Sequence, residues 1–263
     1  MTQPRRPSDR VLEASGAELQ HLSGGRGLAW RAENIVLRPS EADGEVQWKA
    51  DVLARLDHSE RFRAPRPVRA ESGEWSFDRW EAWQWLPGAA DETRVVDVLD
   101  TGNAFHAALS ELERPAFVDV ADDPWSRADR MAWQEEDLPT DPTLGQLAGA
   151  FAPIEAPSQI VHGDLLGNVL FERGAPATII DWAPYWRPVG YASAIVLADA
   201  ACWHDLPTAP LAALVRDMPE GAQMLLRALV FRIATLHLLG RWDDRMVQHH
   251  SPIVRTALAL ALP

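Results

Sequence analysis

The chain has 263 residues, of which 47% are hydrophobic and 24% charged, with a formal net charge of −13. We therefore expect a soluble globular protein, built as one large domain or two compact lobes, whose main partner is neither nucleic acid nor an anionic membrane. The single cysteine, Cys202, excludes an internal disulfide and fits a cytoplasmic location, and we find neither a signal-like N-terminal run nor an apolar stretch of bilayer length.

The N-terminal third is predicted to be a small, mostly antiparallel sheet with one helix. Residues 18–22 are strand-like, and residues 28–32 and 34–38 form a hairpin that ends before Pro39, because proline cannot donate to a strand ladder. Apolar residues at helical spacing predict a helix over residues 44–57. Three further strand-like segments follow, at residues 66–70, 74–79 and 80–86.

A Leu-Pro-Gly break at residues 86–88 marks the expected boundary between two lobes. We assign residues 1–86 to an N-terminal lobe with a hinge at 83–88, and residues 87–263 to a C-terminal lobe. Beyond the break the pattern becomes helical. Helices are expected at residues 92–112, 124–136, 143–151, 191–204, 209–217, 221–240 and 251–261, and short strands at 159–161, 169–171 and 177–181.

Two short motifs in the C-terminal lobe carry the chemistry. Residues 162–168 read HGDLLGN before an apolar strand, and residues 180–182 read IDW at the end of another. A loop aspartate such as Asp164 can accept a proton from an attacking hydroxyl, while Asn168 and Asp181 can hold a magnesium ion that bridges phosphates. The alternative is a capped loop with incidental acids.

With these motifs in place, the chain resembles the aminoglycoside phosphotransferase and choline kinase family of the protein-kinase-like fold, and most closely an actinobacterial group of that fold. The resemblance covers roughly residues 18–205. It implies an α+β fold with two lobes: a small antiparallel β-sheet N-lobe that binds nucleotide, and a mainly helical C-lobe that carries the catalytic loop 162–168 and the metal motif 180–182.

The same resemblance implies a role for each motif residue. Asp164 is the expected catalytic base, and Asn168 and Asp181 are the expected Mg²⁺ ligands. His162 is expected to hold the loop, and Asp199 to brace the loop backbone from the following helix.

The catalytic loop departs from the family pattern in its length. Asn168 follows Asp164 by four positions, whereas the family usually has five. Gly167 can supply the unusual backbone angle of a tighter loop. Asn168 then either reaches the metal as in relatives or bonds within the loop, leaving Asp181 and phosphate oxygens to hold the ion.

The phosphates of the nucleotide are expected at a glycine-rich turn, Gly24, Gly25 and Gly27, where backbone N–H groups can approach phosphate oxygens. Arg38 takes the strand position of the kinase phosphate-clamping lysine and can bind phosphate through its planar fork. The expected acidic partner of Arg38 on the next helix is Glu45. Hairpin turns and sheet edges also use glycine and arginine without any ligand.

The segment Trp83-Gln84-Trp85-Leu86 resembles the adenine-binding hinge of the family. Trp83 is expected behind the base, with the Gln84 carbonyl and the Leu86 N–H facing its edge. These contacts use backbone atoms, so the sequence does not separate ATP from GTP.

The acceptor pocket is expected near Tyr185 and Trp186, which follow the metal motif, and near the acids Glu135 and Glu136. Acidic groups there suit an amine-bearing acceptor, while solvated helix ends and a packed loop are the alternatives.

The sequence therefore predicts an ATP- or GTP-dependent, Mg²⁺-dependent phosphotransferase that acts on a hydroxyl of a small molecule, such as an amino sugar, a sugar, an aminoglycoside or an amino alcohol. The competing hypothesis is a kinase-fold nucleotide-binding or regulatory protein without transfer activity.

Overall fold

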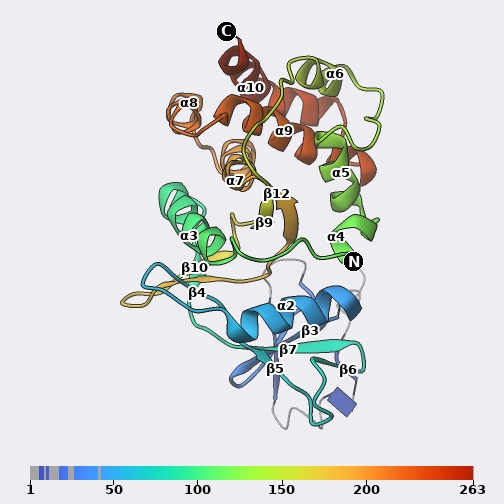
Figure 1. The fold of residues 1–263 in the computed structure, drawn as a ribbon, viewed down its shortest axis with the longest axis vertical. Helices are drawn as coiled ribbons and strands as arrows, with labels where there is room; N and C mark the ends of the chain where they lie inside the picture. Colours follow the sequence, from blue (N-terminus) through green and yellow to red (C-terminus); the bar gives the residue numbers. More distant parts are fainter. Residues whose placement is uncertain (1–5, 9, 12–17, 23–26, 41–42, 263) are drawn as a thin grey trace. The chain divides into compact units, whose positions relative to one another are not determined.

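The protein is described by a computed structural model that covers residues 6–8, 10–11, 18–22, 27–40 and 43–262 (Figure 1). The chain divides into two compact units. Unit 1 contains residues 1–90 and 169–180, and unit 2 contains residues 91–168 and 181–263.

The main sheet of unit 1 has the strand order β1-β2-β3-β7-β5, with β6 paired to β7, and every pairing in it is antiparallel. Its strands are β1 Leu19–His21, β2 Trp30–Ala32, β3 Ile35–Pro39, β5 Pro67–Val68, β6 Ser76–Phe77 and β7 Trp80–Gln84. Strand β3 runs one residue further than predicted, because Pro39 still faces Trp80 across the ladder. The small core on this sheet includes Ala32, Leu37 and Trp80.

Helix α2, Asp43–Arg55, also belongs to unit 1, and its buried side chains recur at helical spacing. Val46, Ala50 and Leu53 share this buried face with Lys49, whose side chain is 2% exposed. A buried ammonium needs a partner, and Lys49 Nζ lies 3.0 Å from Glu45 Oε1, one helical turn earlier.

A second sheet in unit 1 has the order β4-β11-β10-β8. Its strands are β4 Phe62–Arg63, β8 Ala89–Ala90, β10 Val169–Phe171 and β11 Ala177–Ile179. Because β10 pairs with β8 and β11 pairs with β4, the hairpin over residues 169–180 belongs to unit 1. The first division between units falls after Ala90. Both features differ from the predicted boundary, since two-residue strands such as β4 and β8 leave no periodic pattern in the sequence.

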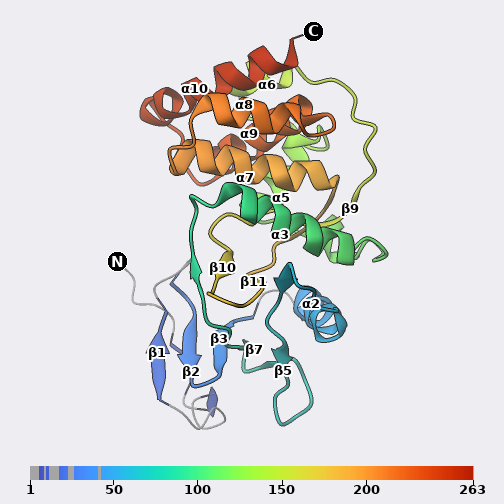
Figure 2. The same cartoon turned by 90° about the vertical axis from the view of Figure 1, so that its left-hand side faces the viewer.

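Unit 2 is mainly helical. Its helices are α3 Val95–Ala108, α4 Phe117–Val120, α5 Pro124–Ala132, α6 Pro142–Ala148, α7 Val189–Trp203, α8 Thr208–Arg216, α9 Gly221–Leu238 and α10 Asp244–Ala261. Helix α9 is the central element, in contact with α5, α6, α7, α8 and α10, and Figure 2 shows several of these helices stacked on one another. Leu225, Leu229 and Ile233 of α9 are fully buried. This packing makes α9 a rigid support for the loops around it.

The predicted bounds of several helices in unit 2 are wrong. Helix α3 is shorter than residues 92–112 at both ends. Helix α10 starts at Asp244, well before the predicted residue 251, and contains Pro252 in its interior. The sequence placed Pro252 in a first turn, where proline is normally tolerated; instead, the Asp243 carboxylate accepts from Met246 N at 2.9 Å and starts the helix there.

An antiparallel pair, β9 Gln159–His162 and β12 Pro184–Arg187, lies in unit 2, with His162 opposite Pro184 and Tyr185 opposite Val161. No strand was predicted here, and a packed loop was only the alternative to an acceptor pocket, whereas residues 184–187 form strand β12. No helix in the described part of the chain is long and apolar enough to cross a membrane.

Candidate active site

The two sequence motifs meet through backbone and ring contacts inside unit 2. Gly163 N donates to Ala183 O at 2.9 Å, and the Trp182 indole Nε1 donates to Val161 O at 3.3 Å. Asp181 itself is exposed and has a φ of 50°, in the left-handed region. A non-glycine residue held there is uncommon and concentrates at functional sites. The pairing thus fixes the metal motif next to the start of the catalytic loop.

Two buried histidines, His162 and His106, hold the backbone of the loop over residues 162–168. His162 is fully buried, and its Nδ1 accepts from Asp164 N at 3.1 Å. The backbone N–H of His162 donates in turn to Nε2 of His106, at 2.9 Å. Burial, helped by the proximity of His162, lowers the pKa of His106 to about 3, so this ring stays neutral and can accept the bond. The chain of contacts ties the Asp164 backbone to helix α3.

The side chain of Asn168 turns back onto Asp164. Its Nδ2 lies 2.7 Å from Asp164 O and 3.3 Å from Asp164 Oδ2. Both partners are acceptors, so the contacting atom must be the amide nitrogen. No described residue donates to Asn168 Oδ1. Gly167, with φ of 85°, provides the left-handed turn that closes this short loop.

The Asp164 carboxylate is held by an arginine that the sequence analysis did not identify. Arg232 Nη2 of helix α9 donates to Asp164 Oδ1 at 2.7 Å. Arg232 Nε also donates to Asp199 Oδ1 at 2.8 Å, and its Nη2 contacts Asp199 Oδ2. The side chains of Arg232, Asp199 and Asp164 are 14%, 11% and 48% exposed.

This arrangement corrects the role expected for Asp199. Its hydrogen bonds go to Arg232 rather than to the loop backbone, so it acts on the loop through a second side chain. Burial raises the pKa of Asp199 even though Arg232 opposes the shift. Burial alone would lower the pKa of Arg232. The negative charges of Asp199 and Asp164 have the larger effect, so the pKa of Arg232 is raised. The Arg232 guanidinium therefore stays positively charged beside the Asp164 carboxylate.

In unit 1, the expected phosphate clamp has a different acidic partner from the one predicted. Arg38 Nε donates to Glu81, which lies directly opposite it across the β3–β7 ladder and has a side chain 1% exposed. Glu45, the expected partner, contacts Lys49. Glu81 Oε2 is buried and accepts no hydrogen bond within the described part of the chain. The fork of Arg38 is 19% exposed and lies 5.7 Å from the centre of the Trp83 ring.

The other nucleotide residues are only partly described. Gly24 and Gly25 lie outside the described residues. Gly27 has a φ of 65°, and its carbonyl accepts from His21 Nε2 at 2.8 Å. In the hinge, Gln84 N donates to Arg66 O at 2.8 Å, while the Leu86 N–H is not donated to any described residue. Trp83 is 7% exposed and packed within the sheet.

Comparison with known proteins decides the family. The model of the phosphotransferase enzyme family matches residues 30–217, which is more than half of the chain. The chain belongs to the phosphotransferase enzyme family. Membership places it among small-molecule kinases that use a hydroxyl group as acceptor. No curated protein sequence matches the chain.

Solved structures of phosphotransferases share the fold. A thermostable mutant of aminoglycoside phosphotransferase APH(4)-Ia, bound to AMP-PNP and hygromycin B, aligns with 18% identity and a TM-score of 0.59, covering 94% of this chain and 97% of that one. Spectinomycin phosphotransferase APH(9)-Ia, bound to ADP and spectinomycin, gives 15% identity, a TM-score of 0.54 and coverage of 99% and 100%.

A choline/ethanolamine kinase family protein from Mesorhizobium loti gives 16% identity, a TM-score of 0.58 and coverage of 95% and 94%. At these identities the likeness establishes the fold. The predicted α+β, protein-kinase-like fold, with an antiparallel N-terminal sheet and a helical C-terminal region, is confirmed.

The acids expected to recognise a cationic acceptor of this phosphotransferase are already paired. Glu135 accepts from Arg187 Nη1 at 2.7 Å and from Arg187 Nη2 at 2.8 Å. Glu136 accepts from Arg127 Nε at 2.8 Å and from Arg130 Nε at 3.3 Å. Both acids are therefore already paired with arginines, and these contacts do not support the prediction that they form an acidic acceptor pocket.

Tyr185 and Trp186, the other expected pocket residues, lie on β12 and are both partly exposed. The Tyr185 ring packs edge-on against Phe231 of α9, with 5.8 Å between ring centres. Tyr185 also covers the backbone of Gly163, which directly precedes Asp164. This strand therefore places an aromatic side chain beside the catalytic loop.

The donor set suits magnesium. Asn168 offers an amide oxygen and Asp181 a carboxylate, the hard oxygen ligands that Mg²⁺ prefers. Within the described ranges no group of three His, Cys, Asp or Glu side chains is suited to a metal ion. A site with only two protein ligands fits Mg²⁺, which usually keeps several waters and binds phosphate oxygens in addition.

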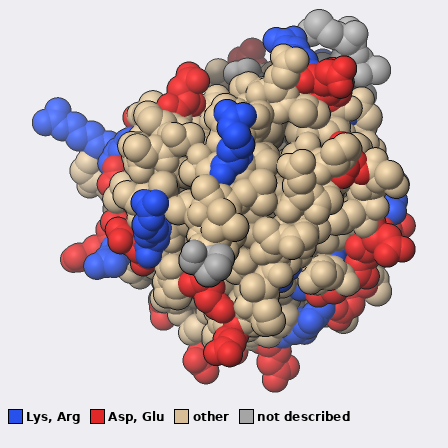
Figure 3. All heavy atoms as spheres, turned by 90° about the horizontal axis from the view of Figure 1, so that it is seen from above, with Lys and Arg blue, Asp and Glu red and all other residues tan. Residues whose placement is uncertain are grey.

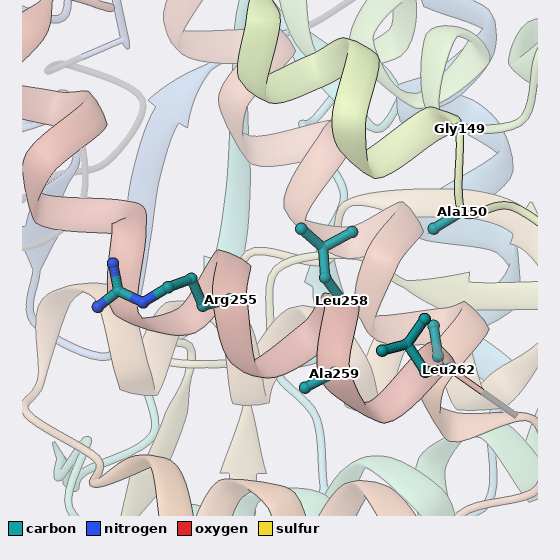
Figure 4. A pocket seen from close by; sticks show the side chains of 7 residues that line it. Gly149, Ala150, Arg255, Leu258, Ala259 and Leu262 are labelled. Carbon is teal, nitrogen blue, oxygen red and sulfur yellow. The ribbon is translucent and has the colours of Figure 1, made fainter.

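A surface hollow of about 570 Å³ lies elsewhere in unit 2, between the ends of α6 and α10 (Figure 4). It is lined mainly by small and apolar residues, including Leu258 and Leu262, and by Arg255. Figure 3 shows the charges on one face of the protein: Lys and Arg side chains are scattered there, and residues other than Lys, Arg, Asp and Glu form most of its middle. None of the residues that line the hollow belongs to the catalytic loop or the metal motif.

Proposed function

We propose that this phosphotransferase moves the γ-phosphoryl group of ATP or GTP to a hydroxyl of a small molecule, with Asp164 as the base and Asn168 and Asp181 as ligands of Mg²⁺. The acceptor classes that we propose are amino sugars, sugars, aminoglycosides and amino alcohols. A cytoplasmic location, where nucleotide is available, fits this activity.

The observation that carries the proposal is the geometry of the catalytic loop. The Asp164 side chain is 48% exposed while its backbone is fixed by His162. Asn168 uses its amide nitrogen within the loop and keeps Oδ1 for a ligand. A half-exposed carboxylate on a fixed backbone, next to oxygen donors, is what phosphoryl transfer needs from a protein, since catalysis there is positioning and charge stabilisation.

In the proposed reaction, Asp164 accepts the proton of the acceptor hydroxyl as the hydroxyl oxygen bonds to the γ-phosphorus. The bond from that phosphorus to the β–γ bridging oxygen breaks, and the nucleoside diphosphate leaves. Bound Mg²⁺ would neutralise charge on the phosphate oxygens. Arg38 would hold phosphate oxygens of the nucleotide, and the hinge backbone at Leu86 would contact its base.

The similar structures described above support a nucleotide, since APH(4)-Ia is bound to AMP-PNP and APH(9)-Ia to ADP. They also support small acceptors, because two hold hygromycin B or spectinomycin. Because Glu135 and Glu136 are paired with arginines, we do not assign recognition of an acceptor amine to them.

Thermal unfolding with Mg²⁺ and ATP or GTP tests nucleotide binding first. A ligand at 100 times its Kd adds about 2.7 kcal/mol, and for a chain of this size each kcal/mol raises the midpoint by about 2–4 °C. Asp181→Asn is the matched variant, because asparagine tolerates the left-handed backbone at this position. We expect a Mg²⁺-dependent rise of several degrees that the variant lacks.

Transfer to a panel of hydroxyl acceptors tests the base. Asp164→Asn should lower turnover by roughly 10²–10⁴-fold, the usual loss for a general base, while nucleotide binding is retained. Near-normal turnover would remove Asp164 from this role. A nucleotide-induced shift without transfer to any acceptor would instead support the nucleotide-binding or regulatory hypothesis.

A further inference from the structure

We propose that Arg232 is a positioning residue for phosphoryl transfer: it holds Asp164 Oδ1 from helix α9, so that Asp164 Oδ2 is the oxygen that takes the proton of the acceptor. This inference rests on the proposed function of Asp164 as the base.

The two carboxylate oxygens of Asp164 have different hydrogen-bond partners. Oδ1 accepts from Arg232 Nη2 at 2.7 Å. Among the described residues, Oδ2 has only the longer contact of 3.3 Å to Asn168 Nδ2. A charge-assisted bond of the shorter length is the stronger of the two, so Oδ2 is the more available oxygen for an incoming hydroxyl.

Arg232 is itself held in place. Its planar guanidinium makes two bonds to Asp199, through Nε and Nη2. A fork of this kind fixes orientation as well as distance. Asp199 belongs to α7, which packs against α9. The Arg232 guanidinium also lies 4.9 Å from the centre of the Phe231 ring. The carboxylate of Asp164 is thereby anchored to two core helices rather than to its own loop alone.

The anchoring matters because the Asp164 side chain is otherwise only lightly restrained. It is 48% exposed, and a carboxylate on a loop can rotate away from the acceptor. A misplacement of about 1 Å can cost about 10²-fold in rate. Loss of Arg232 should therefore lower kcat while leaving the affinity for nucleotide unchanged.

The test measures kcat and KM for Arg232→Gln and Arg232→Lys, each with and without Asp164→Asn. We expect Arg232→Gln to lower kcat by about 10²-fold with little change in the KM of the nucleotide. Arg232→Lys keeps one charged donor and should recover part of that loss. With Asp164→Asn already present, Arg232→Gln should have no further effect on kcat, since Arg232 acts through the Asp164 carboxylate.

Arg227→Gln is the matched control. Arg227 lies on the same helix and is also buried, but its Nη1 donates to Ala132 O at 2.9 Å and its Nη2 to Ala152 O at 3.2 Å. Its loss should alter stability and leave kcat near the wild-type value. Should Arg232→Gln fail to fold because Asp199 loses its partner, the double variant Arg232→Gln with Asp199→Asn removes both charges and replaces the single variant.

The outcomes separate the two proposals. The role of Arg232 would be overturned, without affecting the proposed function, by either of two results. One is an unchanged kcat in Arg232→Gln, and the other is a fall in kcat of the same size whether or not Asp164→Asn is present. No transfer by the wild-type protein to any acceptor would overturn the proposed function, and the role of Arg232 with it.

Discussion

The ring of Tyr185 lies directly against the backbone of Gly163, so closely that a Cβ on Gly163 would sit 2.4 Å from Tyr185 Cδ2. Gly163 precedes the proposed base, and its N–H donates to Ala183 O on the segment that leads into β12. The absence of a side chain at Gly163 thus lets the catalytic loop and β12 approach one another.

Gly163→Ala should therefore be destabilising. Overpacking of this kind typically costs about 1–3 kcal/mol, which lowers the thermal midpoint by about 2–4 °C per kcal/mol at this size. Transfer should fall as well, because Asp164 is displaced. Gly145→Ala in α6 is the control: nothing lies within 4 Å of its added Cβ, so its midpoint should stay equal or rise. Equal midpoints for wild type and Gly163→Ala would contradict the close packing.

Asn168→Asp should impair the loop although it preserves size and an oxygen ligand. The replaced nitrogen faces two acceptors, Asp164 O and Asp164 Oδ2, so a carboxylate there loses both bonds and adds repulsion, at a cost of about 1–3 kcal/mol. We expect a higher Mg²⁺ concentration for half-maximal transfer, measured by titration of the metal. Asn103→Asp, on the exposed face of α3, should behave as wild type. A wild-type Mg²⁺ requirement in Asn168→Asp would mean that the two contacts of Asn168 Nδ2 do not hold the loop in the geometry that transfer needs.

His106 should make stability depend on pH. An unfolded histidine protonates below about 6.5, whereas burial lowers the pKa of folded His106 to about 3. Between these values the unfolded chain binds more protons, so stability is fully present above about pH 6.5 and falls as the pH is lowered toward 3.

The variant His106→Gln isolates this contribution. Its side-chain oxygen can still accept from His162 N, but it does not titrate. The free energy of unfolding, measured in urea, should fall less between pH 7 and pH 5 in the variant than in the wild type. His21→Gln, at an exposed position, should leave the wild-type loss intact. An unchanged pH dependence in His106→Gln would show that His106 is not the group responsible.

The buried pair of Arg187 and Asp129 should be costly to break. Arg187 Nε and Nη2 donate to Asp129 Oδ2 at 3.0 Å and 2.7 Å, and both side chains are 8% exposed. Arg187→Gln leaves Asp129 buried without a cation, which typically costs about 3–5 kcal/mol. Arg127→Gln breaks the pair with Glu136, in which Arg127 is 41% exposed, and should cost at most about 1 kcal/mol.

Denaturant midpoints measure both variants, and adding Asp129→Asn to Arg187→Gln should recover part of the loss. Similar midpoints for Arg187→Gln and Arg127→Gln would rule out a buried pair of this strength.

The sequence by itself determined the family, the fold class and the order of the motifs. The loop over residues 162–168 and the metal motif over residues 180–182 carry their chemistry in short segments, where backbone geometry and residue type are set locally. The position of Gly167 predicted a tight turn, and its φ of 85° agrees. Most helices were predicted because their buried faces repeat along the chain.

Only the tertiary structure decided which charges meet. Arg232 reaches Asp164 across 68 residues, and Arg38 meets Glu81 across 43 residues. Glu135 is paired with Arg187 from 52 residues away. Such partners depend on which helices and strands pack against one another. The sequence around a charged residue looks the same whether its side chain contacts solvent, a ligand or another charged group. The order of the proposed catalytic residues can therefore be read from the sequence, whereas the contacts that hold their side chains form only when the helices and strands pack together.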